Sequence, residues 1–89
     1  MQSKAVTIIN KLGLHARASM RLVDIAHRFG SRIQLHYRNQ CIDAKDILAV
    51  MTLGAGCGAT LTLQAEGEDE QNAISALISL IENRLGESE

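Results

Sequence analysis

Two kinds of hydrophobic pattern follow one another along this chain, one typical of strands and one typical of helices. Short runs that are rich in β-branched residues, or that alternate between apolar and polar residues, predict strands. Four strands are expected, at Ala5–Ile9, Ile33–Tyr37, Cys41–Ala44 and Thr60–Glu66. Apolar residues at three- and four-residue spacing, or an apolar run behind a capping residue, predict helices. Three helices are expected, at Ala16–Phe29, Ile47–Leu53 and Ile74–Leu85.

Residues at the ends of these helices support the predicted boundaries. Asp46 is a good N-cap for the middle helix, and Gly54 stops that helix. Gly30 closes the first helix at the position where a left-handed C-cap favours glycine. The last residues, Gly86–Glu89, follow the third helix and are expected to fray.

The order strand-helix-strand-strand-helix-strand-helix indicates an α+β fold. Strands with one polar side suit an antiparallel sheet that has one face in water and helices packed on the other. We therefore expect an open-faced β-sandwich, a four-stranded antiparallel sheet with three helices on one face. The 89 residues contain no linker, repeat or low-complexity segment, so one domain, 1–89, is expected.

Charge and composition argue against a nucleic-acid partner. Lys and Arg number 9 against 10 Asp and Glu, which gives a formal net charge of −1 instead of the basic stripe of a nucleic-acid domain. Aromatic residues make up only 2% of the chain, so few rings are available to stack on bases.

Three features of the sequence favour the cytoplasm. The first residues, Met1–Lys4, show no signal peptide. The longest apolar run, Ile47–Met51, is far too short to span a bilayer, so no membrane association is expected. Cys41 and Cys57 share no C-x-x-C or zinc-like spacing, which favours reduced thiols that act as small hydrophobic residues.

The stretch Gly13-Leu14-His15-Ala16-Arg17 lies where the first predicted strand gives way to the first helix. A helix begins with backbone N–H groups that have no internal partner, and its dipole favours anions there. His15 occupies this boundary, and Arg17 follows two residues later. A neutral imidazole nitrogen is a nucleophile toward phosphorus. His15 is therefore a candidate carrier of a phosphoryl group whose oxygens the amides from Ala16 onward and the Arg17 guanidinium would hold.

The alternative is that His15 is simply an exposed residue ahead of a helix. Helix starts that favour anions are common, so this position alone does not indicate a functional site. His27 and His36 have no metal-ligand spacing to His15, so no metal site is expected. No Ser-His-Asp or Cys-His arrangement can be argued, and the sequence indicates no cofactor.

An exposed apolar surface is expected beside His15. On the first helix, Ala16, Met20 and Val23 lie away from the stripe that faces the core. The helix Ile47–Leu53 is apolar nearly all round, yet a helix on a sheet buries only one side. An exposed apolar patch marks a partner surface, and methionine suits a surface that accepts several partners. The alternative is that the middle helix is fully buried.

The segment Asn10–Arg17 resembles the active-site signature of the histidine-containing phosphocarrier (HPr) family of the bacterial phosphotransferase system. Asp43–Leu53 resembles the second helix of that family with its lead-in, and Ala65–Glu70 resembles its last strand-to-helix junction. The likeness covers essentially the whole chain. The first motif is quite specific, whereas the other two would be weak alone.

The resemblance implies that an Enzyme I-type phosphotransferase, using phosphoenolpyruvate, phosphorylates His15 on Nδ1. It implies that the group then passes to an Enzyme IIA-type acceptor with the assistance of Arg17. It also implies a docking face shared by both partners. The members of this docking face are Ala16, Met20, Ile47, Leu48 and Met51.

Two positions depart from the family pattern. Ala18 stands where the signature most often has proline; alanine is a good helix former, so the site is expected to survive with a less rigid first turn. Chains with this variant resemble the nitrogen-related (NPr-type) branch. Asp46 stands where many relatives carry a serine that a regulatory kinase phosphorylates. A carboxylate removes that regulation and leaves a permanent negative charge beside the docking face.

The leading hypothesis is a stoichiometric phosphoryl carrier, a phosphohistidine intermediate rather than a true catalyst, working as a monomer between two partners. The alternative is a regulatory module that docks onto a kinase or transcription factor through its apolar face. A small RNA-binding domain of similar topology is disfavoured by the charge and the aromatic content.

Overall fold

Four strands form one antiparallel sheet in the spatial order β1-β4-β2-β3 in the computed structural model, which describes residues 1–89. The strands are β1 (Gln2–Thr7), β2 (Arg32–Tyr37), β3 (Gln40–Asp43) and β4 (Thr60–Glu66). The helices are α1 (Ala16–Ala26), α2 (Ile47–Thr52) and α3 (Glu70–Glu82), followed by the 3-10 turn η1 (Arg84–Gly86). The order of elements and the antiparallel sheet agree with the prediction.

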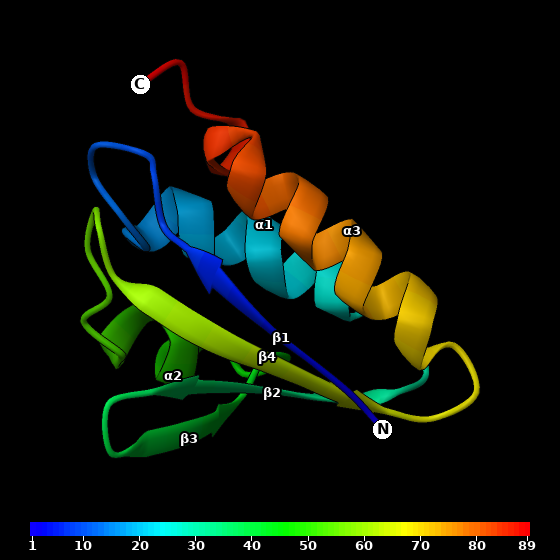
Figure 1. The fold of residues 1–89 in the computed structure, drawn as a ribbon. Helices are drawn as coiled ribbons and strands as arrows, with labels where there is room; N and C mark the ends of the chain where they lie inside the picture. The colour runs from blue at the N-terminus through cyan, green and yellow to red at the C-terminus, as the bar shows by residue number, and fades with distance from the viewer.

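The two central strands, β2 and β4, supply most of the inner face of the sheet. In β4, Leu61, Leu63 and Ala65 are buried, and the register sets Ala65 opposite Ile33 and Leu63 opposite Leu35 of β2. Figure 1 shows α1 and α3 running side by side along the sheet, and both helices contribute to a core of 21 buried apolar residues. The alternation read in the sequence is therefore the alternation between core and solvent.

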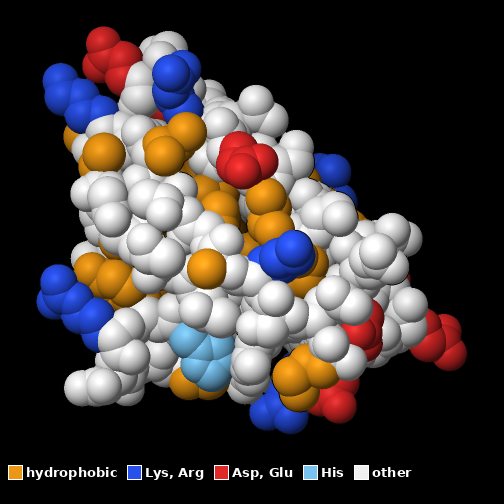
Figure 2. All heavy atoms as spheres, viewed as in Figure 1, with side chains coloured by type: hydrophobic (Ala, Val, Ile, Leu, Met, Phe, Trp, Pro, Cys, Tyr) orange, Lys and Arg blue, Asp and Glu red, His pale blue; other side chains and the backbone are white.

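The surface is mixed in character. In the view of Figure 1, Figure 2 shows hydrophobic side chains as separate small groups among polar and backbone atoms, with charged side chains scattered between them. None of the helices combines the length and hydrophobicity needed to cross a membrane. Cys41 and Cys57 are free thiols, as expected, but both are exposed, so the expectation that they act as small hydrophobic residues, which are usually buried, is wrong.

The end of α1 differs from the prediction. The helix ends at Ala26, and the segment up to Phe29 forms tighter turns, with the Phe29 amide donating to the Ala26 carbonyl at 3.3 Å. Gly30 does not adopt a left-handed conformation, so its predicted C-cap role is wrong. Instead the Gly30 amide donates to the Asp69 carboxylate at 2.9 Å, and the Ser31 amide donates to it at 3.0 Å. A contact with the start of α3 therefore sets this end.

Two further details differ. The first strand covers Gln2–Thr7 instead of Ala5–Ile9, because its ladder with β4 runs from the pair Gln2–Ala65 to the pair Thr7–Thr60. Val23, predicted to lie away from the core, is only 9% exposed. Helix α2 packs against α1 and covers a side of α1 that a helical wheel of α1 alone would leave in solvent, which explains why Val23 is buried.

Candidate functional site

The loop between β1 and α1 is held closely against the loop between α2 and β4. The Leu14 amide donates to the Ala55 carbonyl at 3.0 Å. Gly13 has a φ of +63°, and a Cβ atom at this position would lie 2.6 Å from the Cα of Gly56. Only glycine fits such a backbone conformation and such a close approach. His15 follows Leu14 directly, so these backbone contacts of Gly13 and Leu14 determine its position.

His15 is the N-cap residue of α1, with an extended backbone (φ −73°, ψ 178°) and a side chain that makes no capping bond. The first hydrogen bond of the helix runs from the Ser19 amide to the His15 carbonyl at 2.8 Å. The amides of Ala16, Arg17 and Ala18 precede that bond and have no partner within the helix. The imidazole is 24% exposed. The predicted arrangement, an accessible imidazole at a helix start, is present.

A carboxylate joins the imidazole to two arginines of α1. Oε1 of Glu87 lies 2.7 Å from Nε2 of His15 and 3.3 Å from Nη2 of Arg17. Its other oxygen, Oε2, accepts a hydrogen bond from Nη1 of Arg21 at 2.7 Å. The Arg21 hydrogen bond is the main cause that lowers the pKa of Glu87 from 4.5 to about 2, and hydrogen bonds from His15 and Arg17 add to it. Glu87 is therefore a charged acceptor at neutral pH.

The end of the chain reaches this site through a left-handed turn. Leu85 and Gly86 have φ angles of 53° and 78°, and the Leu85 side chain is fully buried. Arg21 also donates to the Leu85 carbonyl at 2.7 Å, and the Lys11 amide donates to the Glu89 carbonyl at 2.6 Å. The prediction that this end frays is wrong, because contacts with the loop before α1 and with α1 itself hold it.

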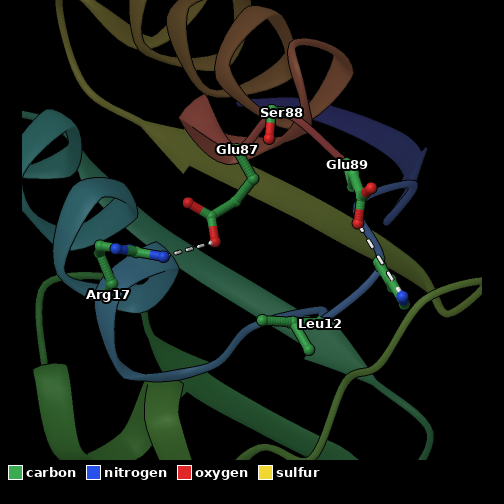
Figure 3. Close-up of a pocket in the computed structure, with 6 residues that line it drawn as sticks. Leu12, Arg17, Glu87, Ser88 and Glu89 are labelled. Atoms are coloured by element: carbon green, nitrogen blue, oxygen red, sulfur yellow. Dashed lines mark hydrogen bonds and ion pairs between the residues drawn. The ribbon is translucent and has the colours of Figure 1, made fainter.

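The terminal segment also forms one wall of a cleft of about 280 Å³ in front of α1. Figure 3 shows Glu87 turned toward Arg17, while Glu89 extends toward the loop that carries Leu12. The lining residues are Lys11, Leu12, Arg17, Glu87, Ser88 and Glu89. Glu87 was not among the site residues predicted from the sequence. A glutamate directly after a turn-forming glycine is the only signal it offers, and that signal is too common to be informative.

The apolar surface expected beside His15 is exposed. In α2 only Val50 is buried, so the alternative of a fully buried helix is wrong. Met20, Leu48 and Met51 are 62%, 70% and 41% exposed, Ala16 is exposed and Ile47 is half-buried. The five residues Ala16, Met20, Ile47, Leu48 and Met51 lie on the adjacent helices α1 and α2, and we call them the docking patch.

A shallow cavity of about 450 Å³ runs between these two helices. Its lining residues are Met20, Val23, Asp24, His27 and Ile47. Apolar and polar side chains therefore meet at this edge of the docking patch, which is the composition that a transient partner surface needs.

Asp46 caps α2 as predicted. Its Oδ1 accepts a hydrogen bond from the Ala49 amide at 3.2 Å, and the residue is exposed beside the docking patch.

The other two histidines, His27 and His36, lie away from His15 and have hydrogen-bond partners of their own. Nε2 of His27 pairs with the Lys45 carbonyl at 2.9 Å, and Nε2 of His36 pairs with Oε1 of Gln64 at 2.6 Å. No group of three or more His, Cys, Asp and Glu side chains is close enough together to hold a metal ion.

Comparison with known proteins connects this arrangement with one family. Residues 2–83 match the family described as "PTS HPr component phosphorylation site". The chain belongs to the HPr family of the phosphotransferase system (PTS). It is 51% identical over 89 residues to the phosphocarrier protein HPr of Cupriavidus necator, with 100% of both chains covered. It is 47% identical over 90 residues to that of Pseudomonas aeruginosa, again with 100% of both chains covered.

The solved structures extend the HPr relationship to the fold. The structure of HPr from Thermoanaerobacter tengcongensis superposes with a TM-score of 0.96 at 42% identity, and 100% of each chain is covered. An HPr structure from Bacillus anthracis superposes with a TM-score of 0.87 at 32% identity, covering 90% of this chain and 95% of that one. The α+β open-faced sandwich and the phosphocarrier function predicted from the sequence are both confirmed.

Proposed function

We propose that His15 accepts a phosphoryl group on Nδ1 and passes it to a second protein. The observation that supports this proposal is the position of the His15 ring, which is partly exposed at the start of α1 and contacts the same Glu87 oxygen as the Arg17 guanidinium. A carrier needs moderate stabilisation, since the group must both arrive and leave. Unbonded helix amides and one arginine supply that without a metal ion.

In the incoming transfer, the lone pair on Nδ1 attacks phosphorus and forms an N–P bond. The bond between phosphorus and the donor atom breaks at the same time, and its electron pair leaves with the donor. The phosphoryl oxygens then accept hydrogen bonds from the amides of Ala16 and Arg17 and from the Arg17 guanidinium. In the outgoing transfer a nucleophile of the acceptor attacks phosphorus, and the N–P electron pair returns to Nδ1.

The proposed donor is an Enzyme I-type phosphotransferase that uses phosphoenolpyruvate, and the proposed acceptor is an Enzyme IIA-type protein. The docking patch supports both interactions, because it is apolar and largely exposed, and two of its residues, Ala16 and Met20, lie on α1, the helix that begins next to His15. The protein would work in the cytoplasm as a single-domain monomer (1–89), and Ala18 favours the nitrogen-related (NPr-type) branch. One HPr structure from Thermoanaerobacter tengcongensis is described as a dimer, so light scattering across concentrations is the test of the monomer.

Mass spectrometry tests the phosphoryl transfer. Incubation with phosphoenolpyruvate and Enzyme I is expected to add the mass of one phosphoryl group, and acid should remove it because an N–P bond is acid-labile. His15→Ala is expected to stay unmodified, while His36→Ala, which changes the histidine on β2 outside the docking patch and its cavity, is the matched control and should be phosphorylated. Phosphate on His15→Ala, or an acid-resistant modification, would contradict the proposal.

The exposure of Leu48 and Met51 also suits a regulatory module that docks without transferring phosphate. The two functions differ in what the imidazole contributes. Capture of partners by the wild type is compared with capture by His15→Ala and Met51→Asp. Binding that is lost only with Met51→Asp, together with no phosphorylation of the wild type, would favour docking alone.

A further inference from the structure

We propose that Glu87 is a positioning residue for His15: its carboxylate holds the imidazole as the Nε2–H tautomer and leaves Nδ1 unprotonated to accept phosphorus. This inference rests on the proposed function of His15 and extends it to the last turn of the chain. It names a residue that no periodic or motif signal in the sequence indicates.

The tautomer follows from the identity of the contact atoms. An ionised carboxylate can only accept hydrogen bonds, so the 2.7 Å contact between Oε1 of Glu87 and Nε2 of His15 requires a proton on Nε2. In a neutral imidazole the other nitrogen then carries the lone pair. No group of the chain hydrogen-bonds Nδ1 of His15, whereas Nε2 is occupied. The nitrogen that must react is therefore the free one.

Glu87 is held in place independently of His15. Arg21 donates through Nη1 to both Oε2 of Glu87 and the Leu85 carbonyl, each at 2.7 Å. A Cβ atom on Gly86 would lie 2.9 Å from the same Nη1, so glycine is what lets the guanidinium approach the turn. The Glu87 side chain is only 12% exposed. A partly buried carboxylate with several donors is preorganised, unlike an ordinary surface ion pair.

Arg17 and Arg21 both contact Glu87, but they differ in distance and exposure. Arg17 makes the longer contact, 3.3 Å, and its side chain is 66% exposed, whereas Arg21 makes the 2.7 Å contact and is 38% exposed. Arg17 can therefore turn toward an incoming phosphoryl group while Arg21 keeps Glu87 in place. After transfer, Nε2 is the one ring nitrogen left to hold a proton, and the carboxylate beside it stabilises the charged ring. A protonated ring is the better leaving group for the outgoing transfer.

Nitrogen-15 NMR of the unphosphorylated protein tests the inference. At a pH above the ordinary imidazole pKa of about 6.5, the shifts of the two ring nitrogens of His15 report which one carries the proton. The wild type is expected to show the Nε2–H form, and Glu87→Ala is expected to show a larger Nδ1–H fraction. Glu87→Gln, whose amide oxygen can still accept from Nε2–H, should retain the wild-type tautomer better than Glu87→Ala. This rescue separates positioning from a general loss of structure.

The rate of phosphorylation by Enzyme I is the second measurement. Glu87→Ala is expected to slow it about tenfold, the factor that corresponds to one net hydrogen bond. Glu89→Gln is the matched control, because Glu89 lines the same cleft but pairs with Lys11 at 3.9 Å and does not contact His15. It should keep both the tautomer and the rate.

Each outcome can be assigned. An unchanged tautomer in Glu87→Ala, or a changed tautomer with an unchanged rate, would overturn the positioning role while leaving phosphorylation of His15 intact. Phosphorylation that persists in His15→Ala would instead overturn the function on which this inference rests. The proposal is supported if the tautomer and the phosphorylation rate both change in Glu87→Ala and both stay unchanged in Glu89→Gln.

Discussion

Gly13 is where the loop before His15 comes closest to the rest of the molecule, and replacing it by alanine measures how firmly that loop is held. Its φ is +63°, a conformation that costs an L residue about 1–2 kcal/mol. The new Cβ would lie 2.6 Å from the Cα of Gly56 and 2.7 Å from the carbonyl oxygen of Ala55. Both are backbone atoms that cannot rotate away, and relieving such overlap costs about 1–3 kcal/mol.

Gly13→Ala is therefore expected to lower the free energy of unfolding by about 2–5 kcal/mol. Urea denaturation followed by circular dichroism measures this loss. Gly54→Ala is the matched control, because Gly54 also has a positive φ (+79°) but no atom lies within 4 Å of its added Cβ. It should lose only about 1–2 kcal/mol. Gly30→Ala has neither problem and should leave stability unchanged or raise it by up to about 1 kcal/mol.

The comparison isolates the close approach from the backbone conformation. If Gly13→Ala and Gly54→Ala lose the same free energy, the contact between the two loops contributes nothing and the reasoning is refuted. Where Gly13→Ala remains folded, displacement of the loop should also slow phosphorylation of His15, since the Leu14–Ala55 hydrogen bond positions the start of α1.

Three other predictions concern Asp46, Glu87 and Met51. Asp46→Ala should lower the free energy of unfolding by about 0.5–2 kcal/mol through loss of the cap, and phosphorylation should persist; a folded but unphosphorylated variant would place Asp46 in the chemistry. The pKa of Glu87 is lowered from 4.5 to about 2, so its stabilising contacts are complete above pH 4.5 and are lost as the pH falls toward 2. The difference in free energy of unfolding between the wild type and Glu87→Gln should therefore shrink as the pH falls from 4.5 toward 2. A difference that stays constant over this range would argue against the contacts of the Glu87 carboxylate with Arg21, His15 and Arg17. Met51→Asp should weaken binding to Enzyme I in calorimetry while leaving the urea midpoint unchanged, because Met51 is 41% exposed; equal affinities would remove Met51 from the docking patch.

The sequence by itself determined the features that depend on near neighbours. Strand β4 was predicted and is observed at Thr60–Glu66, because alternation between core and solvent is visible within the strand. Asp46 caps α2 through an amide three residues away. His15 stands at the start of α1, as the change from strand pattern to helix pattern indicates. The exposed apolar side of α2 also follows, since a helix on a sheet cannot bury every face.

Only the tertiary structure decided the features that depend on distant residues. The Gly30 amide turns to Asp69, and the carboxylate of Glu87 reaches His15, a residue 72 positions earlier in the chain. Neither Asp69 nor Glu87 carries a local signal for its contact, because the two contacts form only once the fold has brought α1 alongside α3, one at the start of α3 and one beyond its end. Hydrogen bonds between neighbours in sequence need a single turn of backbone, whereas these need the whole fold to close.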